Sequence, residues 1–293
     1  MVAGALITEL WQVEWRGVVW GGETPVIAVT DLGGWLDRPP LRGSNAERPG
    51  RHGSHPGRKV AETRTVEVEL TVMSDDPDSA LLRGIENATA YTEEPEEEDL
   101  VIWAGTEQPH LVRARLERVA IPTDHDWSIG HHRSRLQWVA TDPRRYLWFE
   151  ETSPILGMPG GSITGITFPL TLPVTFGSGI SSGSITVTNS GNAATWPTFT
   201  LTGPLTGPTI INANTGQQLR FAPSYVLEDG QTMVIDTDAR SVTIDAGVSR
   251  RDALISADWF PLPAGVPTTI TLASTGTYDA GAGLQVAWRS AYL

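Results

Sequence analysis

Hydrophobic and polar residues alternate along several short stretches of the first half of the chain. In residues 64–72, RTVEVELTV, valine and leucine occupy every second position against glutamate and threonine. This period of two places the apolar side chains on one face of a strand and the polar ones on the other. Residues 11–22 alternate in the same way before a glycine pair, which predicts a strand and a turn. Three further strands are predicted, the last two as a long hairpin: 99–105, 111–121 and 133–141.

Helical spacing predicts one helix, at residues 75–91. Asp76 suits the N-cap and Pro77 the first helical position. The residues expected on the apolar side are Leu81, Leu82, Ile85, Ala88 and Tyr91. The acidic run that follows, EEPEEED at 93–99, is expected to be a solvated loop.

The sequence changes character near residue 150. Residues 1–150 hold 16 of the 21 basic and 25 of the 34 acidic residues, whereas the rest is rich in Thr, Ser, Gly and Asn. There, short apolar segments recur between turn signals, which is typical of a β-sandwich or jelly roll. We therefore expect a mainly β protein with a first domain at 1–152, a Pro- and Gly-rich linker at 153–165 and a β-sandwich at 166–293.

Composition excludes several classes of protein. The chain has no cysteine, so disulfides, thiolate nucleophiles and Cys-ligated zinc are ruled out. Its net charge of −13 disfavours sequence-independent binding to nucleic acid, which needs basic surface. The N-terminus lacks a basic region followed by a long apolar run, so neither a signal peptide nor a membrane span is expected.

Residues 47–60, ERPGRHGSHPGRKV, concentrate cations among glycines and prolines. By composition alone this stretch fits a phosphate cradle, a metal site, a nucleic-acid arm or a flexible loop. No Walker motif accompanies it, and a nucleic-acid site would be isolated in an acidic protein. We interpret it as a long, extended arm whose cations suit an acidic neighbour. The candidate interface residues are Arg42, Arg48, Arg51, His52, His55 and Arg58.

Catalytic motifs are lacking, so we expect no enzyme and no cofactor. No G-x-S-x-G elbow or other nucleophile motif is present. The best group for a metal is Asp124, His125, Asp126, His131 and His132, but it matches no metal-ligand motif. Adjacent histidines on a strand also point to opposite faces. A polar hairpin tip without a metal is the favoured interpretation.

The second half offers candidates for sugar binding or sugar hydrolysis. Trp196, Trp259 and Trp288 could stack on a glycan, although their apolar surroundings favour a place in the core. Four carboxylates could serve a glycosidase, but turn positions explain them equally well: Asp236, Asp238, Asp245 and Asp258.

The order of these features resembles the distal tail proteins of long-tailed, non-contractile phages, the siphovirus-type tail components. The arm RPGRHGSHPGRKV leads into the strand ETRTVEVELTV and then into DDPDSALLRGIENA. A long hairpin ends in RLQWVATDPRRYLW, and the second half contains ITVTNSGNAATWPTFTLTGP. The resemblance covers nearly the whole chain in order, and each motif by itself is short.

The resemblance implies a structural protein of the virion at the distal end of the tail, made in the bacterial cytoplasm. Family members form a ring, usually of six subunits, whose wall is built by a belt domain with a helix. A galectin-like β-sandwich projects outward. The implied partners are further copies of the chain, the tail tube protein and the tail hub, tail-associated lysin or fibre protein. The tape-measure protein is a further candidate, and DNA passes through the lumen without specific binding.

Two other functions remain open at this point. A carbohydrate-binding, receptor-recognition module of the tail tip would use the tryptophans of the sandwich. A glycosidase or depolymerase would require a carboxylate whose loss abolishes activity on host polysaccharide.

Overall fold

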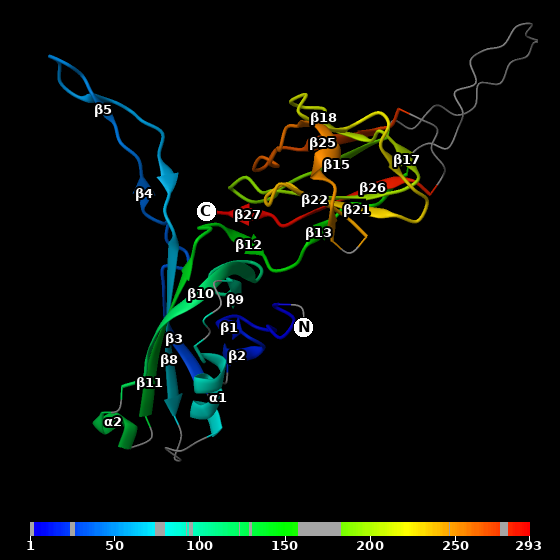
Figure 1. Cartoon of the computed structure of the whole chain (residues 1–293). Coiled ribbons are helices and arrows are strands. Elements are labelled where there is room, and N and C mark those ends of the chain that lie inside the picture. Colours follow the sequence, from blue (N-terminus) through cyan, green and yellow to red (C-terminus); the bar gives the residue numbers. More distant parts are fainter. Residues whose placement is uncertain are drawn as a thin grey trace, which may run out of the picture. The chain divides into compact units, whose positions relative to one another are not determined.

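The computed structural model describes residues 3–23, 27–73, 80–91, 93, 96–122, 124–128, 131–157, 183–245, 247–275 and 281–293. The chain forms two compact units, residues 1–149 together with 292–293 and residues 150–291 (Figure 1). Both are mainly β, as the sequence predicts. Among the described residues, no helix combines the length and the apolar character needed to cross a membrane.

A sheet of nine strands forms the body of the first unit, with β2-β1-β9-β10-β11-β8-β3 as its main order. The ninth member, β27, contributes Tyr292 to this unit and pairs with β12. The strands are β1 (Gln12–Trp15), β2 (Val18–Gly21), β3 (Ile27–Gly33), β8 (Arg64–Met73), β9 (Glu98–Trp103), β10 (His110–Ala120), β11 (His131–Ala140), β12 (Arg145–Leu147) and β27 (Ala291–Tyr292).

Strand β10 joins two halves of this sheet. Its residues 110–114 pair with β9, and its residues 115–120 pair with β11 across a register shift between Leu116 and Arg118. Side chains from both halves meet in one core, where the rings of Trp15 and Trp138 lie edge to face at 5.6 Å. The predicted hairpin of 111–121 with 133–141 is confirmed by this pairing.

The single strand predicted at 11–22 is wrong. Residues 12–15 and 18–21 form the antiparallel pair β1 and β2 instead. The chain reverses at Arg16 and Gly17, which have φ of 49° and 75°. Two successive positive φ values are typical of the tight turn that joins hairpin strands. The alternation therefore continues through a turn that the apolar pattern does not show.

The predicted helix is present as α1 (Ala80–Ala88), which buries Ile85 and Ala88 against the core. Tyr91 does not share that buried side, because its side chain is 86% exposed beyond the end of the helix. Asp76 and Pro77, and the side chains of Leu81 and Leu82, lie outside the described residues. A single helical turn, α2 (His125–Ser128), follows β10.

The second unit is a β-sandwich, as predicted. Two antiparallel sheets contribute side chains to one core, which includes Phe199 from one sheet and Phe221 from the other. The first sheet contains β13 (Glu151–Thr152), β14 (Leu156–Gly157), β16 (Thr198–Thr202), β21 (Thr232–Asp236), β22 (Ser241–Ile244), β23 (Val248–Ser249) and β26 (Gly283–Trp288). The second contains β15 (Ser184–Val187), β18 (Thr209–Asn212), β19 (Gln218–Phe221), β24 (Leu254–Ala257) and β25 (Thr268–Ala273).

Smaller elements complete the second unit. Strands β17 (Leu205–Thr206) and β20 (Val226–Leu227) form a separate pair, and η1 (Arg251–Ala253) precedes β24. Of the expected linker 153–165, residues 153–157 pair with β26, through Ser153 and through β14. Residues 158–165 lie outside the described residues.

Candidate functional site

Residues 38–62, here called the arm, leave the sheet between β3 and β8 as a long two-stranded hairpin (Figure 1). Near the sheet, β4 (Leu41–Arg42) pairs with β7 (Val60–Ala61). Farther out, β5 (Ala46–Glu47) pairs with β6 (Ser54–His55). The cation-rich stretch 47–60 is therefore the tip and the returning strand of this hairpin.

Glycine is needed where the two strands of the arm come closest. A Cβ at Gly57 would lie 1.9 Å from the carbonyl oxygen of Ser44, and one at Gly43 would lie 2.5 Å from that of Arg58. At the tip, Gly50 and Gly53 have φ of 69° and 85°, which side chains disfavour. The glycines thus let the strands approach and turn, so the stretch is a built hairpin.

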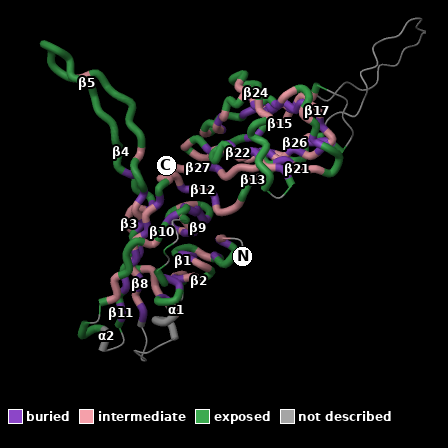
Figure 2. Tube along the Cα trace, in the orientation of Figure 1, coloured by how far each residue is buried: buried purple, intermediate pink, exposed green. Residues whose placement is uncertain are grey.

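The arm buries almost nothing against its own chain. Every residue from Pro40 to Val60 is exposed except Ser54, which is half-buried (Figure 2). Residues 38–62 carry six Arg or Lys side chains and two carboxylates, Glu47 and Glu62. In the part of the chain that the structure describes, none of these cations forms an ion pair. All six candidate interface residues lie on the arm: Arg42, Arg48, Arg51, His52, His55 and Arg58.

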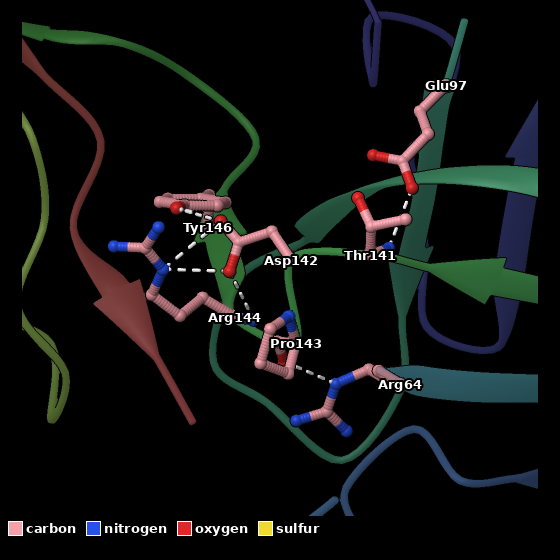
Figure 3. A network of polar contacts seen from close by, with 7 residues as sticks. All are labelled: Arg64, Glu97, Thr141, Asp142, Pro143, Arg144 and Tyr146. Atoms are coloured by element: carbon pink, nitrogen blue, oxygen red, sulfur yellow. Dashed lines mark hydrogen bonds and ion pairs between the residues drawn. The ribbon is translucent and has the colours of Figure 1, made fainter. Parts of the chain in front are cut away.

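The root of the arm, in contrast, is fastened by one buried guanidinium. Arg64, 1% exposed, donates hydrogen bonds to the carbonyl oxygens of Gly34, Trp35 and Asp37 at 2.8–2.9 Å. Its Nε donates to the carbonyl of Pro143 at 2.8 Å (Figure 3). One side chain therefore ties both ends of the arm to the segment between β11 and β12. This fixes the position at which the arm leaves the sheet.

Burial, followed by the positive charge of Arg145, lowers the pKa of Arg64 to about 10. The guanidinium is therefore still charged at neutral pH, where its hydrogen bonds to carbonyls are strongest. The role of Arg64 was not predicted from the sequence, although a signal exists. Arg64 has the same period-two parity as Val66 and Val68, so it falls on the buried face of β8.

The Asp-Pro-Arg segment after β11 is a polar corner (Figure 3). The Asp142 carboxylate accepts hydrogen bonds from the backbone N–H and Nε of Arg144 and from the hydroxyl of Tyr146. Glu97 accepts the N–H of Thr141 at 2.7 Å. Glu97 and Glu98 are thus held in place, Glu98 by an ion pair with Arg16 at 2.6 Å. The prediction of a solvated loop is wrong for this end of the acidic run, where β9 begins.

The metal candidates do not form a site in the described residues, where no group of three or more His, Asp or Glu side chains could hold an ion. His131 is exposed and His132 is 1% exposed, so the two rings point to opposite faces as expected. Asp124, His125 and Asp126 are exposed around α2.

The candidates for sugar chemistry have structural roles in the second unit. Trp196, Trp259 and Trp288 are half-buried, and the last two pack against its core. Three of the carboxylates accept backbone hydrogen bonds: Asp236 from Asp238 and Ala239, Asp245 from Thr232, and Asp258 from Gln218. Whether the tryptophans also contact a glycan or a partner stays a prediction.

Comparison with known proteins finds similarity to components of phage tails. Residues 190–292 match the family described as siphovirus-type tail component, C-terminal domain. The crystal structure of SPP1 Dit (gp 19.1), titled a paradigm of the hub adsorption apparatus in phages that infect Gram-positive bacteria, is similar with a TM-score of 0.67 and 15% identity. That similarity covers 96% of this chain and 99% of the other.

The phage P2 baseplate in its activated conformation with Ca is similar with a TM-score of 0.50 and 12% identity, covering 94% of this chain and 97% of the other. No curated protein sequence matches significantly. The resemblance to siphovirus distal tail proteins is thus confirmed, as is the mainly β fold with its C-terminal sandwich. These relatives support a structural role in the phage tail or baseplate.

Proposed function

We propose that the chain is the repeating subunit of a ring, with six copies, at the distal end of a siphovirus tail. The ring connects the tail tube to the hub, lysin or fibre protein, with the tape-measure protein as a further candidate partner. DNA leaves through its lumen without specific binding. The similarity in fold to a distal tail protein and to a baseplate supports this role.

The exposed cationic arm is the observation that carries the proposal. A two-stranded hairpin without a packed face is marginally stable in water by itself. Arg64 fixes only the root of the arm, so the rest of the arm needs another surface to stabilise it. In a ring, one surface of each copy contacts a different surface of the next, and rotation closes the circle. The arm supplies one of these two surfaces.

Removal of the arm tests the proposal. Deleting residues 43–57 leaves Arg58 and Lys59 as a two-residue connection between the paired residues Arg42 and Val60. Two residues suffice to join antiparallel strands. A second deletion variant, in which Asn-Gly replaces Arg58 and Lys59, has the turn sequence that such a connection prefers. Native mass spectrometry and light scattering should show a ring for the intact chain and a folded monomer for the deletion variant. A ring that survives the deletion contradicts the role of the arm, and an intact chain that stays monomeric at high concentration contradicts the ring itself.

Charge gives this function a second test. The chain has a net charge of −13, and an acidic wall repels the phosphates of passing DNA. We therefore expect part of the acidic excess to face the lumen. A structure of the assembled ring with a neutral or basic lumen would contradict this expectation.

A further inference from the structure

The first unit contains a groove of about 540 Å³ that the role of the arm does not explain. Its walls come from the end of β1 with the turn that follows it, from the residues between α1 and the start of β9, and from β10. Buried Trp15 and half-buried Leu116 line its apolar part. Glu117 lies at the register shift of β10, where an extra residue re-aims the strand.

The groove carries unpaired negative charge. Its two cations are already engaged, Arg16 with Glu98 at 2.6 Å and Arg115 with Glu117 at 3.4 Å. Two further carboxylates in the wall, Glu93 and Glu96, are exposed. Within the described residues neither of them forms an ion pair or a hydrogen bond. The groove therefore has an acidic rim that is available to a cationic partner.

The same wall exposes an aromatic ring. Tyr91, which sequence analysis expected on the buried side of the helix, is 86% exposed at the edge of the groove. Val119, 38% exposed, adds apolar surface to the lining. A guanidinium that pairs with a carboxylate can also stack on an aromatic face, which is the combination that arginine prefers over lysine. The groove thus fits an arginine-bearing segment better than a generic cation.

The arm has the complementary chemistry, with Arg48 and Arg51 at its tip. About nine residues of extended chain separate the root from the tip, which is roughly 30 Å at strand spacing. Figure 1 shows the arm running away from the sheet at the end opposite to α1. Because the Arg64 hydrogen bonds hold the root, the tip points away from the groove of its own chain.

We propose that the tip of the arm of one copy docks in this groove of the next copy, with Arg48 and Arg51 facing Glu93 and Glu96. This inference rests on the ring function proposed above and names the surface that receives the arm. The two surfaces lie at different places on the same unit, so the contact is head to tail and can propagate around a ring.

A charge swap tests the pairing. Glu93→Arg/Glu96→Arg should raise the concentration at which half of the subunits assemble by at least ~10-fold, because like charges then meet at the contact. Arg48→Glu/Arg51→Glu should do the same. Combining both pairs should restore assembly to within ~3-fold of the unaltered chain. The matched control combines Arg48→Glu/Arg51→Glu with Glu228→Arg/Asp229→Arg, which has the same net charge and alters two exposed residues of the second unit.

Mixing two defective chains tests the direction of the contact. The chain lacking residues 43–57 has no arm but keeps its native groove. The Glu93→Arg/Glu96→Arg chain keeps its native arm, including Arg48 and Arg51, but has an altered groove. Only a mixed pair combines a native arm with a native groove, so the arm should dock only within such a pair. We therefore expect native mass spectrometry to detect a 1:1 dimer of these two chains. In the control, Glu228→Arg/Asp229→Arg replaces the groove variant at the same concentration, and 1:1 dimers should not be selected.

The outcomes separate the two proposals. Restoration by the groove pair and not by the Glu228 and Asp229 pair supports docking in the groove. If the arm deletion abolishes the ring but the groove pair neither weakens nor restores assembly, the groove is not the receptor and the ring function stands. If the ring survives the arm deletion, the arm is not the fastening element and docking in the groove fails, whereas the ring function stands; an intact chain that stays monomeric contradicts the ring function. Circular dichroism and thermal unfolding of each variant confirm that the chains compared are folded.

Discussion

Two long hairpins of the first unit differ in almost every physical respect. The β10–β11 hairpin buries Leu136 and Trp138 at 0% exposure, and its alternating pattern was readable from the sequence. The arm has no alternating apolar face and is exposed along nearly its whole length (Figure 2). Both are antiparallel, so backbone pairing does not distinguish them.

The difference lies in where each hairpin finds its stabilising contacts. The side chains of β10 and β11 obtain them inside the unit, where removing apolar area from water contributes about 25 cal/mol per Å². The arm obtains only a fixed root, through Arg64, and close strand crossings at glycines. A hairpin of the second kind is fully stabilised only when another surface covers it, which is what a subunit contact provides.

The largest expected effect breaks the core hairpin. Trp138→Ala removes a ring that packs edge to face against Trp15 at 5.6 Å. It should lower the free energy of unfolding by about 3–5 kcal/mol, since large-to-small core changes leave a cavity. Leu41→Ala, at a residue of the arm that is 46% exposed, should cost less than about 0.5 kcal/mol. Urea titration of both variants measures the contrast, and equal losses would contradict it.

The next effect concerns the root of the arm. Arg64→Met keeps much of the apolar stem but leaves four carbonyl oxygens without their donor. We expect a loss of about 2–4 kcal/mol in the free energy of unfolding. Arg64→Lys should lie between this variant and the unaltered chain, because a lysine cannot reproduce the planar fork. If Arg64→Met left the free energy of unfolding unchanged, the root would need no such fastening.

A smaller effect depends on pH. Burial, followed by the charge of Arg145, lowers the pKa of His110 from 6.5 to about 4, and the ring of Tyr292 packs against it at 4.7 Å. Protonation is therefore harder in the folded state. This contribution to stability is complete above pH 6.5 and is lost as the pH falls towards 4, by up to about 3 kcal/mol. The contribution of His110 is isolated by measuring the free energy of unfolding of the unaltered chain and of His110→Gln at pH 7 and at pH 4.5. The same pH dependence in both chains would contradict the role given to His110.

The smallest effect on global stability sharpens the view of the arm. Gly57→Ala places a Cβ 1.9 Å from the Ser44 carbonyl oxygen, so the two strands must separate. We expect the free energy of unfolding to change by less than about 0.5 kcal/mol, because the arm is outside both cores. Amide exchange in the arm should accelerate and ring assembly should weaken. Ser54→Ala, which lies on the same hairpin and adds no new Cβ, is the matched control and should disturb assembly less. Equal effects of the two variants would contradict the close crossing.

Much of the fold was predictable because apolar periodicity is a local signal. Val66, Val68, Leu70 and Val72 mark the buried face of β8 directly. The hairpin turn at Arg16 and Gly17 was not predicted, because the alternation of apolar residues continues across it. Tyr91 was assigned to the buried side by helical spacing, but α1 ends at Ala88, so that spacing no longer applies.

Candidate chemistry was predictable in part for the same reason. The cations of the arm are adjacent in sequence, so their cluster was visible, and their exposure followed from the lack of apolar neighbours. The groove was not visible, since Trp15, Tyr91 and Leu116 come from three distant segments. The carboxylates Glu93 and Glu96 were interpreted as solvated, and only their place in the groove wall gives them a candidate partner.

The sequence by itself determined a mainly β chain without cysteine, a charge-rich first half, a sandwich in the second half and an exposed cationic stretch between two strands. These properties depend on composition and on the spacing of neighbouring residues. Tertiary structure alone decided that Arg64 fastens the root of the arm, that the tip points away from its own sheet, and that a groove with an acidic rim and an exposed tyrosine faces solvent. Each of these depends on residues far apart in the chain, which become neighbours only when β1, β10 and the end of α1 are packed around one core.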